Sequence, residues 1–132
     1  SIIFIILAGL FNAIMDALWV HYDKSIFKKL NPLWWNPKKS WKAKWKYPLE
    51  ISKRKWYYFG YKPRYAERFP LSSTSLVFLT DAWHFFKALM LLSISLSVVY
   101  YEPIFSPAID IIVYFTCWTG TFTLFYDKVF RD

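Results

Sequence analysis

Three long apolar runs dominate this sequence and limit what the chain can fold into. They cover residues 1–22, roughly 76–101 and roughly 108–130. A helix needs about 20 apolar residues to cross the hydrocarbon core of a bilayer, and each run reaches that length. The first run has no basic segment before it and exceeds the usual apolar core of a secretory signal, so we expect it to be retained. The sequence predicts an all-α membrane protein, a single domain over residues 1–132 with three transmembrane helices.

The segment between the first two runs, residues 23–69, is basic and aromatic. It holds 14 of the 17 Lys and Arg residues of the chain and only three acids. Positively charged loops stay on the cytoplasmic side of a membrane, and the short connection 102–106 contains no Lys or Arg. The tail after the third run again carries Lys128 and Arg131. This pattern predicts an integral membrane protein with its N-terminus outside and its C-terminus inside.

Tryptophans and lysines alternate in the first half of this loop, which indicates a segment at the membrane interface. Asn31-Pro32 and Asn36-Pro37 each suit a helix N-cap followed by a first-turn proline. Trp41 and Trp45 are four residues apart and are expected to share one face of an amphipathic turn, as in segments that lie among lipid headgroups. We predict that anionic lipid headgroups bind Trp34, Trp35, Lys38, Lys39, Trp41, Lys42, Trp45 and Lys46. Nucleic acid is a less favoured partner, because the chain has no nucleic-acid motif and the membrane lies beside this loop.

A polar stripe is expected in the second run. Asp81, His84 and Lys87 are spaced three apart, which places their side chains on one side of a helix. Ser72, Ser73 and Thr74 offer N-caps for that helix. With such a start, Asp81 would lie about 8–9 Å inside the span, at a rise of about 1.5 Å per residue.

The first run carries polar residues at a similar depth. Asn12 and Asp16 are four apart and share a face, and Asp16 lies about 9 Å in from the end of the run. Because the first two helices run antiparallel, Asp16 and Asp81 can meet at one level. His21 is about 140° around the helix from Asp16 and is the weakest member. We predict an intramembrane polar cluster of Asn12, Asp16, Asp81, His84 and Lys87.

Three interpretations of this cluster remain open, because a charged side chain near the bilayer centre costs about 2.5–3.5 kcal/mol and needs a partner or a task. In the first, Asp16, Asp81, His84 and His21 bind a divalent metal such as zinc, manganese or iron, although no HExxH-type spacing is present. A metal with an open position would support a membrane-embedded enzyme acting on a lipid or polar ligand. In the second the cluster is structural and forms hydrogen bonds between helices. In the third it is part of a proton or ion pathway.

The third run offers fewer chemical groups. Cys117 is the single cysteine, so a disulfide within the chain is excluded and a packing role is favoured. Asp110 is expected in the first turn of the helix, where an acid is stabilised by the helix dipole. A small polar side suited to close helix packing is formed by Thr116, Thr119, Gly120, Thr121 and Thr123.

Several stretches carry a resemblance: Phe11-Asn-Ala-Ile-Met-Asp16, residues 21–41 with their two Asn-Pro pairs, Phe69-Pro-Leu-Ser-Ser-Thr74 and Leu79-Thr-Asp-Ala-Trp-His84. They resemble small integral membrane proteins of Bacteroidota-type bacteria and their phages, over roughly residues 9–90. The resemblance implies a bacterial inner membrane location. That group has no established activity, so the resemblance assigns no functional residues.

Together these features favour an accessory or structural subunit of a membrane complex, or a homo-oligomer, with a loop that binds lipid headgroups. Such a small bundle with 23% aromatic residues leaves many rings in need of neighbours. The metal-dependent enzyme and the proton or ion pathway are the two alternatives.

Overall fold

Three long helices form the body of the molecule. A computed structural model describes residues 1–46, 56–59, 62–65 and 67–131. The long helices are α1 (Ile2–His21), α4 (Ala82–Val99) and α5 (Pro107–Lys128). By length and composition, each is able to cross a membrane. The predicted helical membrane fold with three spanning segments is therefore confirmed.

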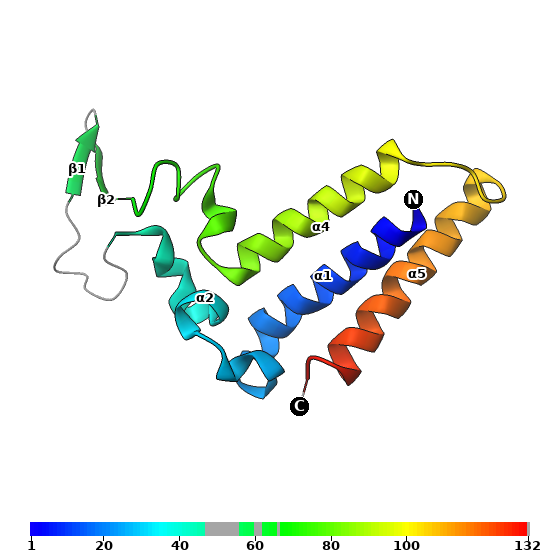
Figure 1. Ribbon diagram of the computed structural model, residues 1–132, viewed down its shortest axis with the longest axis horizontal. Helices are drawn as coiled ribbons and strands as arrows, with labels where there is room; N and C mark the ends of the chain where they lie inside the picture. Colours follow the sequence, from blue (N-terminus) through cyan, green and yellow to red (C-terminus); the bar gives the residue numbers. More distant parts are fainter. Residues whose placement is uncertain (47–55, 60–61, 66, 132) are drawn as a thin grey trace.

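Helix α1 lies between the other two long helices and packs against both (Figure 1). It runs antiparallel to α4 and parallel to α5. The N-terminus and the α4–α5 connection are consequently at one end of the layer. The segment after α1 and the C-terminus are at the other, which we call the basic end (Figure 1).

The two sides of α1 are built differently. Toward α5 it presents Gly9, where an added Cβ would lie only 2.7 Å from the backbone oxygen of Trp118. Toward α4 it presents rings, since Phe11 packs on Phe86 with ring centroids 5.9 Å apart and Trp19 packs on Trp83 at 6.2 Å. Small residues at one interface allow close backbone approach, which is how helices associate in lipid.

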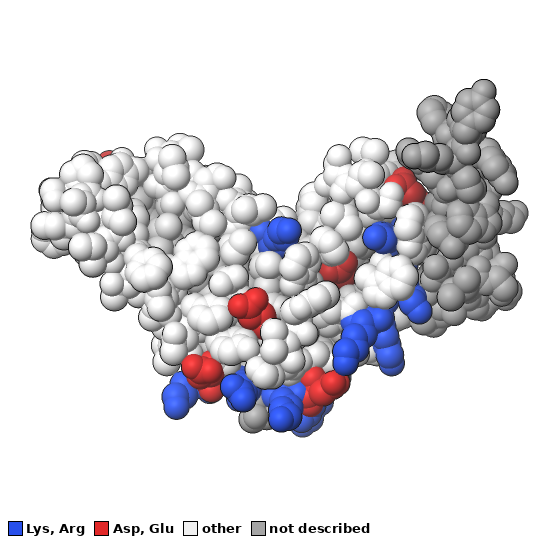
Figure 2. Space-filling model, turned by 180° about the vertical axis from the view of Figure 1, so that it is seen from behind, with Lys and Arg blue, Asp and Glu red and all other residues white. Residues whose placement is uncertain are grey.

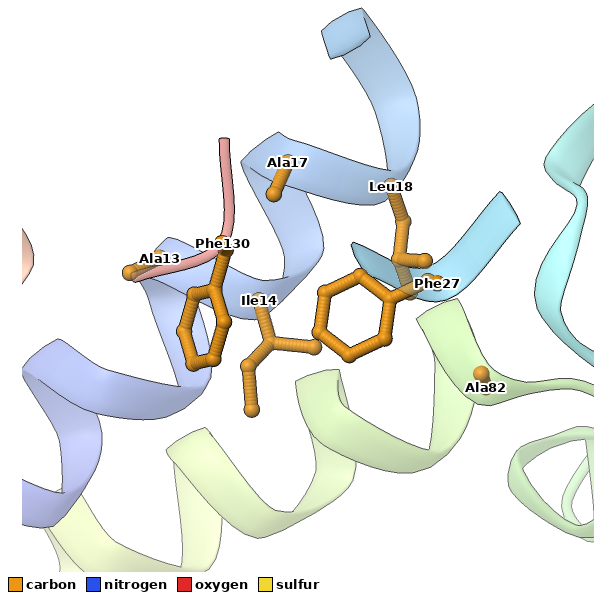
Figure 3. Close-up of a cluster of buried hydrophobic side chains, with 7 residues drawn as sticks. All are labelled: Ala13, Ile14, Ala17, Leu18, Phe27, Ala82 and Phe130. Atoms are coloured by element: carbon orange, nitrogen blue, oxygen red, sulfur yellow. The ribbon is translucent and has the colours of Figure 1, made fainter. Parts of the chain in front are cut away.

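The hydrophobic core lies at the basic end. Figure 3 shows the rings of Phe27 and Phe130 on either side of Ile14, in a cluster that also includes Leu18 and Ala82. The C-terminal residues close this core, because the backbone N–H of Ile26 donates to the carbonyl oxygen of Phe130 at 3.2 Å. The chain end is thus fastened to the segment that follows α1.

That segment is a series of short helical turns. They are η1 (Tyr22–Lys24), η2 (Ile26–Lys29), α2 (Pro32–Trp35), α3 (Pro37–Ser40) and η3 (Trp41–Lys44). The predicted caps are confirmed: the side chain of Asn31 accepts from the N–H of Leu33 and that of Asn36 from the N–H of Lys38, each at 3.0 Å.

The prediction that Trp41 and Trp45 share a helix face is wrong. The helical turn ends at Lys44, and Trp45 is extended and bridges to Glu67.

The loop also contains a small antiparallel hairpin of β1 (Trp56–Phe59) and β2 (Lys62–Tyr65), which adds to the predicted helical fold.

The chain then reaches α4 through η5 (Val77–Leu79). The second long helix starts at Ala82, six residues later than predicted, and its N-cap is Asp81 rather than a residue in 72–74. The side chain of Glu67 instead accepts from the N–H groups of Leu71, at 3.0 Å, and Ser73, at 3.2 Å, so this stretch forms its own turn.

Asp110 organises the opposite end. It lies in the first turn of α5, as predicted, and is buried. Its carboxylate accepts from the Tyr101 hydroxyl at 2.9 Å and from the N–H groups of Ile104 (3.0 Å) and Phe105 (3.1 Å). The hydrogen bond to Asp110 is the main reason that the pKa of Tyr101 is raised. The α4–α5 connection is therefore held by one carboxylate.

Candidate functional site at the basic end

On the face shown in Figure 2, most charged residues gather toward the basic end, whereas the surface at the opposite end is largely uncharged. The outward sides of α4 and α5 are exposed and apolar, with residues such as Val98, Ile111 and Phe115. Such sides suit contact with lipid chains. Figure 2 shows Lys and Arg side chains along the edge below this apolar surface, where a headgroup layer would lie.

The residues predicted to bind headgroups fall into two sets. The side chains of Lys38, Lys39, Trp41 and Lys46 are exposed, and those of Lys42 and Trp45 are half-buried.

The rings of Trp34 and Trp35 instead pack inside the fold. Trp35 stacks on Phe27 with ring centroids 5.0 Å apart, and Trp34 contacts Phe85 at 6.2 Å. These two tryptophans therefore pack the segment against the rest of the fold, whereas the ring of Trp41 is exposed.

A pocket of about 430 Å³, which we call the interfacial groove, lies between the end of α1 and the α3–η3 turns. Its apolar wall is formed by Leu18, Trp19, Val20, Pro37 and Trp41. Its polar lining consists of Tyr22, Asp23, Asn36 and Lys38. The groove thus joins an apolar wall at the end of a membrane span to charged groups at the basic end.

Two opposite charges face each other at this groove. The Lys38 ammonium nitrogen is 3.9 Å from a carboxylate oxygen of Asp23, and these side chains are 84% and 81% exposed. Because both side chains are exposed, both charges are accessible to a ligand. An ion pair this exposed contributes little to the stability of the fold. The nearby Tyr22 hydroxyl is buried and has no hydrogen-bond partner among the described residues.

Asp81 and His84 adjoin the groove. They line a smaller pocket of about 50 Å³ that shares Trp19, Pro37 and Trp41 with it. One Asp81 oxygen accepts from the backbone N–H of His84 at 3.0 Å, and the other is 2.7 Å from the His84 Nδ1. Asp81 is buried, at 2% exposed, and one oxygen of its carboxylate caps α4 while the other contacts the His84 ring.

Lys87 does not join this pair. Its ammonium nitrogen is 5.0 Å from the centre of the Trp83 ring, and its side chain is exposed. Because α4 begins only at Ala82, Asp81 lies at the start of the helix rather than two turns inside it.

Asp16 and His21 face the other neighbour of α1. Asp16 is seven residues after Gly9 and so lies on nearly the same helix face, toward α5. It is close enough to Tyr126 of α5 to interact with it electrostatically, and the His21 ring packs on the same tyrosine at 5.7 Å. Asn12 is half-buried in α1.

The predicted polar cluster is therefore divided between two interfaces. Within the described part of the chain, no three or more His, Cys, Asp or Glu side chains lie together as a metal site requires. Asp16 does not join Asp81 and His84, because the close contact at Gly9 turns the acid toward α5.

The groove contains residues that sequence reasoning did not select. Asp23 is one of only three acids in the basic loop, which was a usable signal. The short helices η2 and α2 lie between Asp23 and Lys38 in the chain, so no spacing rule predicts that these two side chains meet. Comparison of the chain with known protein families, curated proteins and solved structures finds no match.

Proposed function

We propose that this small integral membrane protein binds anionic lipid headgroups through its basic end and acts as an accessory or structural subunit of a membrane complex. The observation that carries the proposal is the exposure of Lys39 and Lys46 at the end where the three spans meet the basic segment. Each basic residue near an anionic surface contributes about 1 kcal/mol of attraction. By the positive-inside rule we assign this end to the cytoplasmic side. The resemblance described above supports a bacterial inner membrane as the location.

The subunit role is supported by the open arrangement of the helices. Because α1 occupies the middle of the layer, the outward sides of α4 and α5 have no protein neighbour among the described residues. A second copy or another membrane subunit has room to pack on either side. The mass of the protein extracted directly from its own membrane in mild detergent tests this, because partner subunits are then still present. Assemblies larger than the 15.9 kDa chain support the proposal, and a monomer in every mild detergent contradicts it.

Lipid binding is tested by native mass spectrometry of the purified protein with phosphatidylglycerol or phosphatidylcholine. We expect preferential retention of the anionic lipid. Replacing Lys39, Lys42 and Lys46 together by Gln is expected to weaken that retention at least tenfold, given about 1 kcal/mol per charge. The matched control replaces the same three residues by Arg and preserves the charge. Equal retention by the Gln and Arg variants would exclude this role for the lysines.

The metal-dependent alternative has less support, because the described residues gather only Asp81 and His84 and not a third ligand. Metal analysis of the purified protein discriminates between the two. A stoichiometric metal that is lost in both Asp81→Ala and His84→Ala would favour the enzyme over the subunit. For the proton or ion pathway the corresponding measurement is flux into liposomes, which Asp81→Asn would remove.

A further inference from the structure

We infer that the interfacial groove is a specific site for one zwitterionic phospholipid whose headgroup carries a phosphate and a primary amine. The phosphate would contact Lys38 and the amine Asp23. This inference rests on the proposed function only in placing the basic end at the headgroup layer. It names a ligand different from the anionic lipid that the other lysines attract.

The position and size of the groove suit part of a lipid. Its volume of about 430 Å³ lies in the range of about 300–1,000 Å³ typical of small-molecule sites. Trp19 and Trp41 are 69% and 46% exposed. Their rings are large and amphipathic. Tryptophans of this kind concentrate where a span meets the headgroups, with the ring against the upper part of the lipid chains.

The charges of the groove specify the headgroup. Asp23 and Lys38 both line the groove, lie close together and are exposed, so they offer one negative and one positive contact side by side. A headgroup with a phosphate and an ammonium group satisfies both. A headgroup with a phosphate alone satisfies Lys38 but brings its negative charge near the Asp23 carboxylate, and such like-charge contacts provide specificity by repulsion.

The remaining lining favours the same ligand. Asn36 caps α3 and presents a neutral polar group beside Lys38. The apolar wall is formed by the end of α1 together with Pro37 and Trp41, so a ligand that has a charged head and a hydrocarbon body fits the groove better than free phosphate or a free amine.

The test measures lipid binding to the full chain by native mass spectrometry. Phosphatidylethanolamine and phosphatidylglycerol with identical acyl chains are titrated separately and in competition. We expect one saturable phosphatidylethanolamine site that phosphatidylglycerol does not displace. Asp23→Asn and Lys38→Gln should each weaken it about tenfold, the value of one charge-assisted hydrogen bond. The controls Asp127→Asn and Lys128→Gln change the same charges at the same end, on exposed residues outside the groove.

The charge-exchange variant, with Asp23→Lys and Lys38→Asp together, separates a specific pair from net charge. It restores one acid and one base to the groove, so phosphatidylethanolamine binding should recover. Equal competition by phosphatidylglycerol, or equal losses in the groove and control variants, would overturn the inference. Both results leave the anionic lipid measurement on Lys39, Lys42 and Lys46 unaffected, so the failure of either proposal can be recognised separately.

Discussion

At the scale of single residues, Asp81 shows how one carboxylate fixes the start of a membrane helix. Its first oxygen accepts a hydrogen bond from the N–H of His84. Its second oxygen accepts one from the Thr80 hydroxyl at 3.1 Å and lies 2.7 Å from Nδ1 of the His84 imidazole. A helix start in an apolar setting needs such a partner, because unpaired N–H groups are costly away from water. The spacing of Asp81 and His84 was visible in the sequence, since both contacts are local.

Replacing Asp81 separates its capping role from its contact with the imidazole. Asp81→Ala is expected to lower the free energy of unfolding by about 0.5–2 kcal/mol, the usual range for loss of an N-cap. Asp81→Asn keeps an oxygen for the His84 N–H and should retain most of that stability. Unfolding in mixed detergent micelles provides the measurement, and an equal loss in both variants would show that the charge dominates.

Tyr22 gives a prediction in the opposite direction. Its buried hydroxyl has no partner in the described part of the chain, and a buried unsatisfied polar group costs about 1–3 kcal/mol. Tyr22→Phe removes the hydroxyl and keeps the ring, so we expect unchanged or increased thermal stability in detergent. A clear decrease would mean that the hydroxyl does form a hydrogen bond in the membrane.

At the scale of elements, the rotation of α1 decides which side chains can meet. The sequence predicted the existence and approximate limits of all three long helices, because length and apolar composition suffice for that. It did not predict that Asp16 turns toward Tyr126 instead of Asp81, because rotation is set by the steric fit at Gly9. It also placed the start of the second helix too early. Hydropathy does not distinguish the 77–79 turn from the helix that follows, and the capping contact does.

The close contact at Gly9 is testable with the other glycine on this helix pair. Gly9→Ala would place a methyl group 2.7 Å from the Trp118 oxygen, so α5 must move, and we expect a loss of about 1–3 kcal/mol. Gly120→Ala meets nothing within 4 Å and should be neutral or stabilising by up to about 1 kcal/mol, the gain in helix propensity. Equal effects of the two variants on unfolding would show that the helices adjust freely.

At the scale of the whole molecule, α1 is antiparallel to α4 and parallel to α5. The α1–α4 and α4–α5 connections therefore lie at opposite ends of the molecule. The Asp110-centred turn lies at one end, and the basic segment lies at the other with the C-terminus (Figure 1). Composition alone predicted this division, because the 102–106 connection has no basic residue and the 23–69 loop has 14. The interfacial groove was not predictable in the same way, since it depends on how irregular turns fold back on the end of α1.

Chemical labelling tests this arrangement in the membrane. With Cys117 replaced by Ala, single cysteines at the exposed positions Phe105 and Lys39 should react with a membrane-impermeant maleimide from opposite sides. The positive-inside rule predicts that position 105 reacts in intact cells and position 39 only after the membrane is opened. Reaction of both in intact cells would contradict three crossings.

The fastening of Ile26 to Phe130 has a consequence for synthesis of the protein. Residues near the start of the chain leave the ribosome first, so α1 enters the membrane while both of its future neighbours are still unmade. The strand-like contact that closes the core joins the turn after α1 to residues translated after all three helices. A chain cut short before residue 130 would therefore keep all three long helices but lack the ring that closes the core.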